Sequence, residues 1–161
     1  MSTANKILVY IDGTEQSVTA AQYAICLASD SRAELLALYV INTRAMEDLL
    51  KAQIFLQNEQ VEYERDMEAD AERYLNYINE LALKKGVTIA KHSARGSVHK
   101  EIDKLVKDEG VDLLVIGELS RIRSRRDEFY DESERAMRSV PCSVLIVKDE
   151  DAVYEMYEAL V

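Results

Sequence analysis

The stretch KILVYI, residues Lys6–Ile11, followed by the pair Asp12-Gly13, decides the fold class of this chain. It is an almost unbroken apolar run that ends at a turn, which is typical of a strand buried on both faces of a parallel sheet. Thr14 or Ser17 is placed to cap a helix directly after this turn. Four apolar residues then follow at helical spacing, at Val18, Ala21, Ile25 and Ala28. The chain therefore begins with a buried strand, a turn and an amphipathic helix.

The same alternation of apolar runs and helical segments continues along the chain. Four more strands are expected at Leu35–Ile41, Val87–Ala94, Val111–Ile116 and Cys142–Val147. Val87–Ala94 alternates apolar and polar residues, so we expect it at an edge of the sheet. Strands separated by amphipathic helices indicate an α/β fold, with a five-stranded parallel sheet and helices on both faces.

Helices are expected within residues 43–85 and over Ser97–Asp108 and Ser133–Ser139. The first of these segments carries one apolar stripe, formed by Met67, Ala71, Tyr74, Ile78 and Leu81. Lys84, Lys85 and Gly86 then form a helix stop signal. These elements, together with the strands, fill residues 1–148, which we assign to one α/β domain.

Residues 149–161 are assigned to an acidic C-terminal tail. Its apolar residues recur at the spacing of a helix, at Val153, Met156, Tyr157 and Leu160. We expect this tail to pack on its own domain or on a dimer partner, and docking to another protein is the functional alternative.

The overall charge excludes several classes of partner. The 161 residues include 20 Lys and Arg against 30 Asp and Glu, which gives a net charge of −10. Nucleic acids and anionic membranes both require a basic surface, so neither is expected to bind. The start of the chain does not resemble a signal peptide, and no apolar run is long enough to cross a membrane. With Cys26 and Cys142 interpreted as reduced, buried thiols, this predicts a cytoplasmic protein.

A ligand of such a sheet binds beyond the carboxyl ends of the strands, where the strand order reverses. The loops that begin at Asp12 and at Gly117 lie there. A response-regulator receiver would also fit this architecture, but it needs a phospho-acceptor aspartate after the third strand. That strand ends in Ala94-Arg95-Gly96, so the receiver interpretation fails at the reactive residue.

Four segments, taken in order, resemble the universal stress protein family. They are KILVYIDGTEQS from Lys6, ELLALYVI from Glu34, ARGSVHKEIDKLVKDEGVDLLVIGE from Ala94 and SERAMRSVPCSVLIV from Ser133. The resemblance implies a Rossmann-like sheet of strand order 3-2-1-4-5 in a cytoplasmic, stress-linked protein. It also implies a homodimer paired through the last strand, at Ser143, Val144, Leu145, Ile146 and Val147. Many members bind ATP or another adenine nucleotide.

The phosphate-binding motif of those members is largely lost here. It reads Gly-x-x-Gly, nine residues, then Gly-Ser/Thr, and the corresponding positions are Gly117, Ser120, Tyr130 and Asp131. A carboxylate ~4 Å from a phosphate charge costs about 4 kcal/mol at an effective dielectric near 20. Arginines at 121, 123, 125 and 126 offer compensation, although five nearby acids compete for them. We favour an exposed loop of internal ion pairs over a phosphate site rebuilt with arginine.

The adenine end of the family's site is better preserved. Asp12 stands where the resemblance implies a contact with adenine, and Val40 stands where backbone groups of the second strand pair with the base. The candidate nucleotide-binding residues are therefore Asp12, Gly13, Val40, Gly117, Ser120, Arg121 and Ser133. Each also has a structural interpretation: Asp12-Gly13 as a turn, Val40 as a core residue and Ser133 as a helix N-cap.

No catalytic or metal-binding set is found in the sequence. His92 and His99 lack accompanying ligands and are expected to be exposed to solvent. We therefore expect a dimeric regulator or interaction module of the stress response, which holds no tightly bound cofactor and has an unidentified protein partner. The alternative is a switch that binds ATP or AMP, with Mg, and weak ATPase activity would follow only from that alternative.

Overall fold

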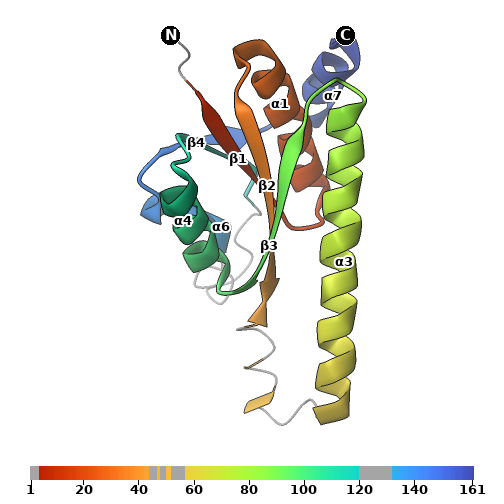
Figure 1. The fold of residues 1–161 in the computed structure, drawn as a ribbon, viewed down its shortest axis with the longest axis vertical. Helices are drawn as coiled ribbons and strands as arrows, with labels where there is room; N and C mark the ends of the chain where they lie inside the picture. Colours follow the sequence, from red (N-terminus) through yellow and green to blue (C-terminus); the bar gives the residue numbers. More distant parts are fainter. Residues whose placement is uncertain (1–3, 44–46, 48–49, 52–56, 120–131) are drawn as a thin grey trace.

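Five parallel strands form a single sheet in the order β3-β2-β1-β4-β5 (Figure 1). The computed structural model describes residues 4–43, 47, 50–51, 57–119 and 132–161. The strands are β1 (Lys6–Ile11), β2 (Glu34–Asn42), β3 (Ile89–Gly96), β4 (Leu113–Gly117) and β5 (Ser143–Val147). This confirms the predicted strand order and places β3 at an edge, as its alternating sequence indicates.

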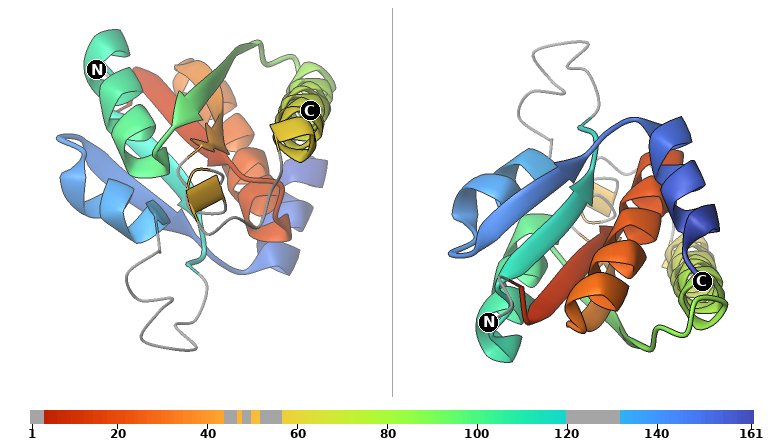
Figure 2. Two further views of the ribbon diagram at one scale, coloured as in Figure 1. Left: turned by 90° about the horizontal axis from the view of Figure 1, so that it is seen from below. Right: turned by 90° about the horizontal axis from the view of Figure 1, so that it is seen from above.

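Helices cover both faces of this sheet (Figure 2). One face carries α1 (Glu15–Ser31), α3 (Gln57–Leu83) and α7 (Glu150–Ala159), and the other carries α4 (Val98–Glu109) and α6 (Glu132–Ser139). Successive residues of a strand point to opposite faces, so β1 supplies both cores. Ile7 and Ile11 are buried among α1 and α3, whereas Leu8 and Tyr10 are buried beneath α4.

The strand boundaries differ slightly from those expected. β2 is one residue longer at each end, β3 begins and ends two residues later, and β4 begins at Leu113. Val87 and Val111, two residues before β3 and β4, are apolar, but they belong to the connections out of the preceding helices. Val87 N–H donates to the Ala82 carbonyl and Val111 N–H to the Val106 carbonyl, so both residues satisfy the helix ends.

The helical predictions are confirmed in their main features. The stripe on α3 faces the core, with Ala71, Ile78 and Leu81 buried. The helix ends at Leu83, and Gly86 follows it with a φ of 72°. Cys26 is buried as expected, but Cys142 is only partly buried, because it lies in the connection just before the edge strand β5.

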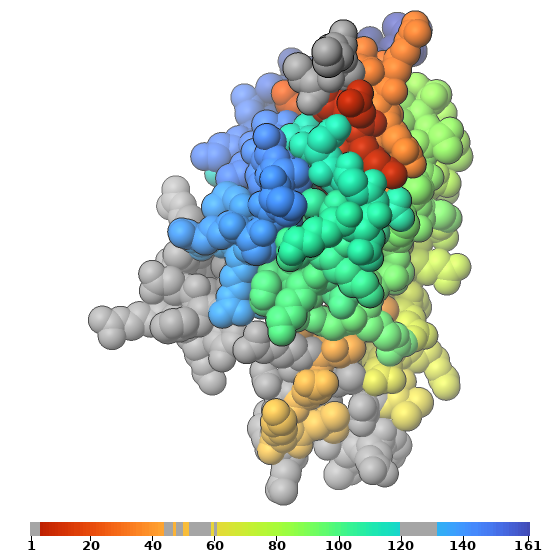
Figure 3. Space-filling model, turned by 60° about the vertical axis from the view of Figure 1, so that its left-hand side comes forward, coloured from red at the N-terminus to blue at the C-terminus, as the bar shows by residue number. Residues whose placement is uncertain are grey.

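The segment 149–161 forms α7 and packs on its own chain. Its Val153 and Tyr157 are buried in the core formed with α1 and α3. The Tyr157 hydroxyl donates to the carbonyl of Leu81 over 2.6 Å, which ties α7 to the last turn of α3. The space-filling view shows the segment 132–147 (blue) at the surface beside α4 (green) (Figure 3).

Candidate functional site

The strand order reverses between β1 and β4, and the loops after these strands define the candidate site. Asp12, Gly13 and Gly117 lie at these carboxyl ends, as the sequence predicts. Ser120 and Arg121 lie outside the described residues.

The turn after β1 is built by its own side chains. The Asp12 Oδ1 atom accepts hydrogen bonds from the Thr14 N–H over 3.0 Å and from the Thr14 hydroxyl over 2.5 Å. Thr14 in turn caps α1, since its Oγ1 accepts from the Ser17 N–H over 3.2 Å. One carboxylate oxygen of the exposed Asp12 is therefore engaged in holding the turn, which leaves the other to face a ligand.

Gly13 meets an aromatic side chain of α3. Its φ is 84°, and a Cβ added there would lie 2.8 Å from Cε2 of Tyr74. The Tyr74 ring is stacked on Tyr39 of β2 with 6.0 Å between centroids, and the Arg73 guanidinium lies 5.1 Å from the Tyr74 centroid. Both conformation and contact thus require glycine at position 13.

This aromatic cluster was not predicted as part of the site. The stripe on α3 does place Tyr74 on the inner face, but nothing in the sequence pairs it with Tyr39. Burial raises the pKa of the Tyr39 hydroxyl, and the nearby charges of Asp70 and Asp12 add to this shift. The cluster therefore borders the Asp12-Gly13 turn on the α3 side.

β2 extends past the end of β1. The last residue pair between them is Ile11 with Tyr39, whereas β2 continues to Asn42 and pairs there with Gly96 of β3. The backbone of residues 40–42 thus has no β1 residue beside it. Val40 itself is 5% exposed and packs beneath α4. Its side chain is therefore a core side chain, and only its backbone is placed to contact a ligand.

Gly117 has a packing role. A Cβ at this position would lie 2.5 Å from the backbone oxygen of Gln16 and 2.6 Å from its carbonyl carbon. The first turn of α1 thus passes too close to β4 for any side chain. The one motif glycine retained in this chain is therefore explained by helix–strand contact, with or without a phosphate.

The prediction for Ser133 as a helix N-cap is wrong. α6 begins at Glu132, so Ser133 lies within its first turn. Glu132 makes the specific contacts here: its Oε2 accepts from the backbone N–H of His99 over 3.0 Å and lies 2.6 Å from the His99 Nδ1. A carboxylate from α6 therefore caps the N-terminus of α4, a role that the Ser97 side chain does not fill.

The prediction that His99 is exposed is also wrong, since its side chain is 20% exposed against Glu132. Burial alone would raise the pKa of the Glu132 carboxyl, but the hydrogen bonds from His99 and the charges of His99 and Arg135 outweigh this and lower it. Ser97 Oγ also lies 3.0 Å from the same His99 Nδ1. Because both partners meet one ring nitrogen, this group does not have the geometry of a catalytic triad.

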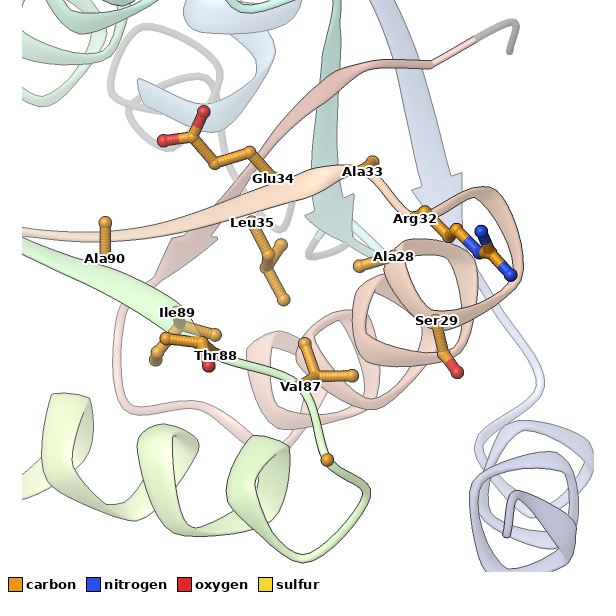
Figure 4. A pocket seen from close by; sticks show the side chains of 11 residues that line it. Ala28, Ser29, Arg32, Ala33, Glu34, Leu35, Val87, Thr88, Ile89 and Ala90 are labelled. Atoms are coloured by element: carbon orange, nitrogen blue, oxygen red, sulfur yellow. The ribbon is translucent and has the colours of Figure 1, made fainter.

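The larger of two hollows in the described surface lies away from the candidate site. A hollow of about 510 Å³ opens beside the first residues of β2 and β3, at the opposite end of the sheet (Figure 4). Leu35 and Val87 point into it, whereas the Glu34 carboxylate and the Arg32 guanidinium point away. Without convergent polar groups, this hollow is not a candidate ligand site.

A second hollow of about 230 Å³ separates β3 from α3. It is lined by Ile41, Ala71 and Leu75 at its floor, with Glu68, Glu72, Asn76, Lys91 and Ser93 around it. Within the described ranges, no group of three or more His, Cys, Asp or Glu side chains is arranged to hold a metal ion. Over the same ranges, no helix is long and apolar enough to cross a membrane.

The last strand leaves one edge open. β5 pairs only with β4 in the described sheet, and Val144, Leu145 and Ile146 are partly exposed, whereas Val147 is buried. The outer edge of β5 thus has no neighbouring strand among the described residues, and three of its apolar side chains are only partly covered.

The fold is shared with solved structures. The hypothetical protein MJ0577 superposes with a TM-score of 0.71 and 21% identity, over 91% of this chain and 97% of that protein. A universal stress protein in complex with cAMP gives 0.65 and 22%, over 91% and 98%. A universal stress protein family member from Arabidopsis thaliana with AMP bound gives 0.64 and 17%, over 92% and 94%.

Sequence comparison points to the same family. Universal stress protein YxiE of Bacillus subtilis is 28% identical over 150 residues, covering 89% of this chain and 99% of YxiE. Universal stress protein MJ0531 of Methanocaldococcus jannaschii is 27% identical over 143 residues, covering 89% of this chain and 81% of MJ0531. The universal stress protein family model matches residues 3–148. The chain belongs to the universal stress protein family, as its four sequence segments indicate.

Proposed function

We propose that this chain is a dimeric, cytoplasmic regulator or interaction module of the stress response that does not hold ATP tightly. The observation that carries the proposal is the contact between Gly117 and the backbone of Gln16. It accounts for the single motif glycine that remains, while positions 120, 130 and 131 carry Ser, Tyr and Asp. The retained glycine is therefore no evidence for a triphosphate site in this chain.

Protein purified without added nucleotide tests this directly. An acid extract is analysed for adenine nucleotides, and the protein is then titrated with Mg-ATP in a calorimeter. We expect no stoichiometric nucleotide and no measurable heat at micromolar ATP. The matched control is the variant S120G/Y130G/D131S, which restores the motif and should gain heat of binding. Stoichiometric ATP in the unmodified protein would refute the proposal and point to Arg121, Arg123, Arg125 and Arg126.

A second candidate function is binding of a mononucleotide such as AMP. It is favoured by the backbone of residues 40 and 41, which extends beyond the last pair between β1 and β2, next to the turn that begins at Asp12. Adenine offers donors and acceptors on one edge, and an open strand backbone matches such an edge. The structures with AMP and with cAMP bound are consistent with a ligand in this fold.

The mononucleotide reading predicts AMP affinity that depends on Asp12. Asp12→Asn keeps an oxygen for the contacts with Thr14 but changes the group that faces the base, so it should weaken AMP binding severalfold. Asp30→Asn, an exposed carboxylate at the end of α1, is the matched control. Equal affinity in both variants would exclude Asp12 from the site.

The dimer is proposed through β5. Its support is the open edge at Val144, Leu145 and Ile146. Light scattering at micromolar concentration should give twice the chain mass for the unmodified protein and the single mass for Val144→Lys. Val61→Lys, at an exposed position on α3, should leave the dimer intact. A monomeric unmodified protein would overturn this part of the proposal.

A further inference from the structure

Exposed large apolar side chains gather on α7 and the last turns of α3. Of the six such side chains exposed among the described residues, all except Val61 lie on these segments or, for Val161, just after α7. These five are Tyr77, Leu83, Tyr154, Met156 and Val161. Single exposed apolar residues are ordinary, but a group of them within a polar surface marks an interaction site.

Two tyrosines of this group lie one turn before the contact between α3 and α7. The two helices meet at their C-terminal ends (Figures 1 and 2). Lys85 Nζ donates to the Leu160 carbonyl over 2.8 Å, and the Tyr157 hydroxyl donates to the Leu81 carbonyl. Tyr77 precedes Leu81 by one turn and Tyr154 precedes Tyr157 by one turn, and the two tyrosines are 45% and 53% exposed.

Tyr77 also lies close enough to Tyr157 to influence its titration. Burial is the main cause of the raised pKa of Tyr157, and the neighbouring Glu158 and Tyr77 add to it. We call the surface around the two exposed tyrosines the tyrosine seam. It consists of Tyr77, Glu80, Asp151, Tyr154 and Glu158.

The tyrosine seam is acidic. Residues 149–158 include five carboxylates and no Lys or Arg. Asp151 and Glu158 are three and four residues from Tyr154, on the adjacent turns, and Glu80 is three residues from Tyr77 on α3. Within the described part of the chain, none of these three carboxylates forms an ion pair, and all three are exposed, with Lys84 and Lys85, just after α3, as the nearby basic residues.

The chain itself shows which chemistry this surface accepts. The ammonium group of Lys85 lies 4.9 Å from the centroid of Tyr157, one turn along from the tyrosine seam. The same group donates to the carbonyls of Leu160 and Glu158. A lysine over the face of a tyrosine, with oxygen acceptors beside it, is a favourable cation–π site. The tyrosine seam also combines tyrosine rings with oxygen acceptors, which are carboxylates there and not carbonyls.

We propose that the tyrosine seam binds a basic amphipathic segment of a partner protein, with apolar side chains against Tyr77 and Tyr154 and Lys or Arg side chains against Glu80, Asp151 and Glu158. The occupant is a cationic peptide segment because exposed carboxylates that form no ion pair flank the exposed aromatic rings. The surface lies on α3 and α7, so it is separate from the β5 edge and from the Asp12-Gly13 turn. The segment 149–161 also follows the residues that the family model matches, 3–148.

The probe is a fluorescein-labelled helical peptide of lysine and leucine with its leucines at i, i+3, i+4 and i+7. Fluorescence anisotropy is measured while the full chain is added at 50 mM and 200 mM salt. Because any acidic protein attracts a basic peptide, two sets of variants separate the tyrosine seam from net charge. Y77S/Y154S removes the rings and keeps the charge. E80Q/D151N/E158Q removes three charges, and its matched control, E62Q/D66N/D108N, removes three exposed charges elsewhere.

We expect the two seam variants to weaken peptide binding at least fivefold, with less than twofold weakening in the matched control. Circular dichroism and the thermal midpoint check that every variant is folded. In two-dimensional NMR, the peptide should shift amide signals of α7 and the end of α3 first. Equal weakening by the matched control, unchanged binding by Y77S/Y154S, or no binding at 50 mM salt would each overturn the proposal.

Discussion

Replacing Gly13 by alanine should destabilise the turn after β1 for two reasons. The first is conformational, since a residue with a Cβ at a φ of 84° costs about 1–2 kcal/mol. The second is steric, because the new methyl group would lie 2.8 and 2.9 Å from two ring carbons of Tyr74. The ring must then move away from Tyr39 and lose part of a pairing that contributes about 0.5–1.5 kcal/mol. We expect the free energy of unfolding to fall by about 1.5–3.5 kcal/mol in total.

The chain provides a matched control for the first cost alone. Gly86 has a φ of 72° and nothing within 4 Å of an added Cβ, so Gly86→Ala should cost only about 1–2 kcal/mol. Urea denaturation at fixed protein concentration measures both variants, because a dimer's stability depends on concentration. In a Tyr74→Ala background the excess cost at position 13 should largely vanish, which is a double-mutant coupling of about 1 kcal/mol. If Gly13→Ala and Gly86→Ala cost the same in both backgrounds, the aromatic contact does not hold this turn.

Three further predictions test other contacts. Gly117→Ala should lower the free energy of unfolding by about 3 kcal/mol or more even without nucleotide, because the backbone of α1 cannot shift without losing other contacts. A change below about 1 kcal/mol would show that this glycine is not needed for packing. Tyr157→Phe should cost about 1–2 kcal/mol in thermal unfolding, because the buried carbonyl of Leu81 loses its donor, whereas Tyr154→Phe on the exposed side should cost almost nothing. Glu132→Gln should cost about 1–2 kcal/mol at pH 7. The pKa of Glu132 is lowered in the folded protein, so the stabilisation by its carboxylate is present above the unfolded pKa of about 4.3. This stabilisation disappears as the pH falls through the folded pKa. In urea titrations near pH 3, the unmodified protein and Glu132→Gln should therefore have similar stability.

The fold was predictable because local and global signals agree in this chain. The apolar run at 6–11 can be buried only between two helical layers, and the alternating residues of β3 fit only an edge. The boundary errors have one cause: Val87 and Val111 are apolar, as strand residues are, but they serve as the ends of the preceding helices. Hydrophobicity alone cannot distinguish these two roles.

The sequence predicted where the candidate site lies, but it did not predict which side chains contact one another there. Asp12 and Gly117 follow from strand order, because they end neighbouring parallel strands. Two contacts join residues more than 30 positions apart in the sequence: Tyr39 with Tyr74, and His99 with Glu132. The periodicity of apolar residues within a helix or strand cannot predict such pairs. The predictions that His99 is exposed and that Ser133 is an N-cap are both wrong. The same contact accounts for both, because the Glu132 carboxylate of α6 covers His99 and caps α4.

The two edges of the sheet restrict how copies of this chain can assemble. β3 carries Lys91, His92 and Arg95 along its length, and charged side chains on an edge strand disfavour addition of a further strand. β5 instead offers Val144 and Ile146 on its open edge. A sheet with two receptive edges can be extended at both ends into a filament, whereas a sheet with one receptive edge is closed by a single pairing. The proposed pairing through β5 would therefore stop at two copies, and a continuous ten-stranded sheet would be its upper size.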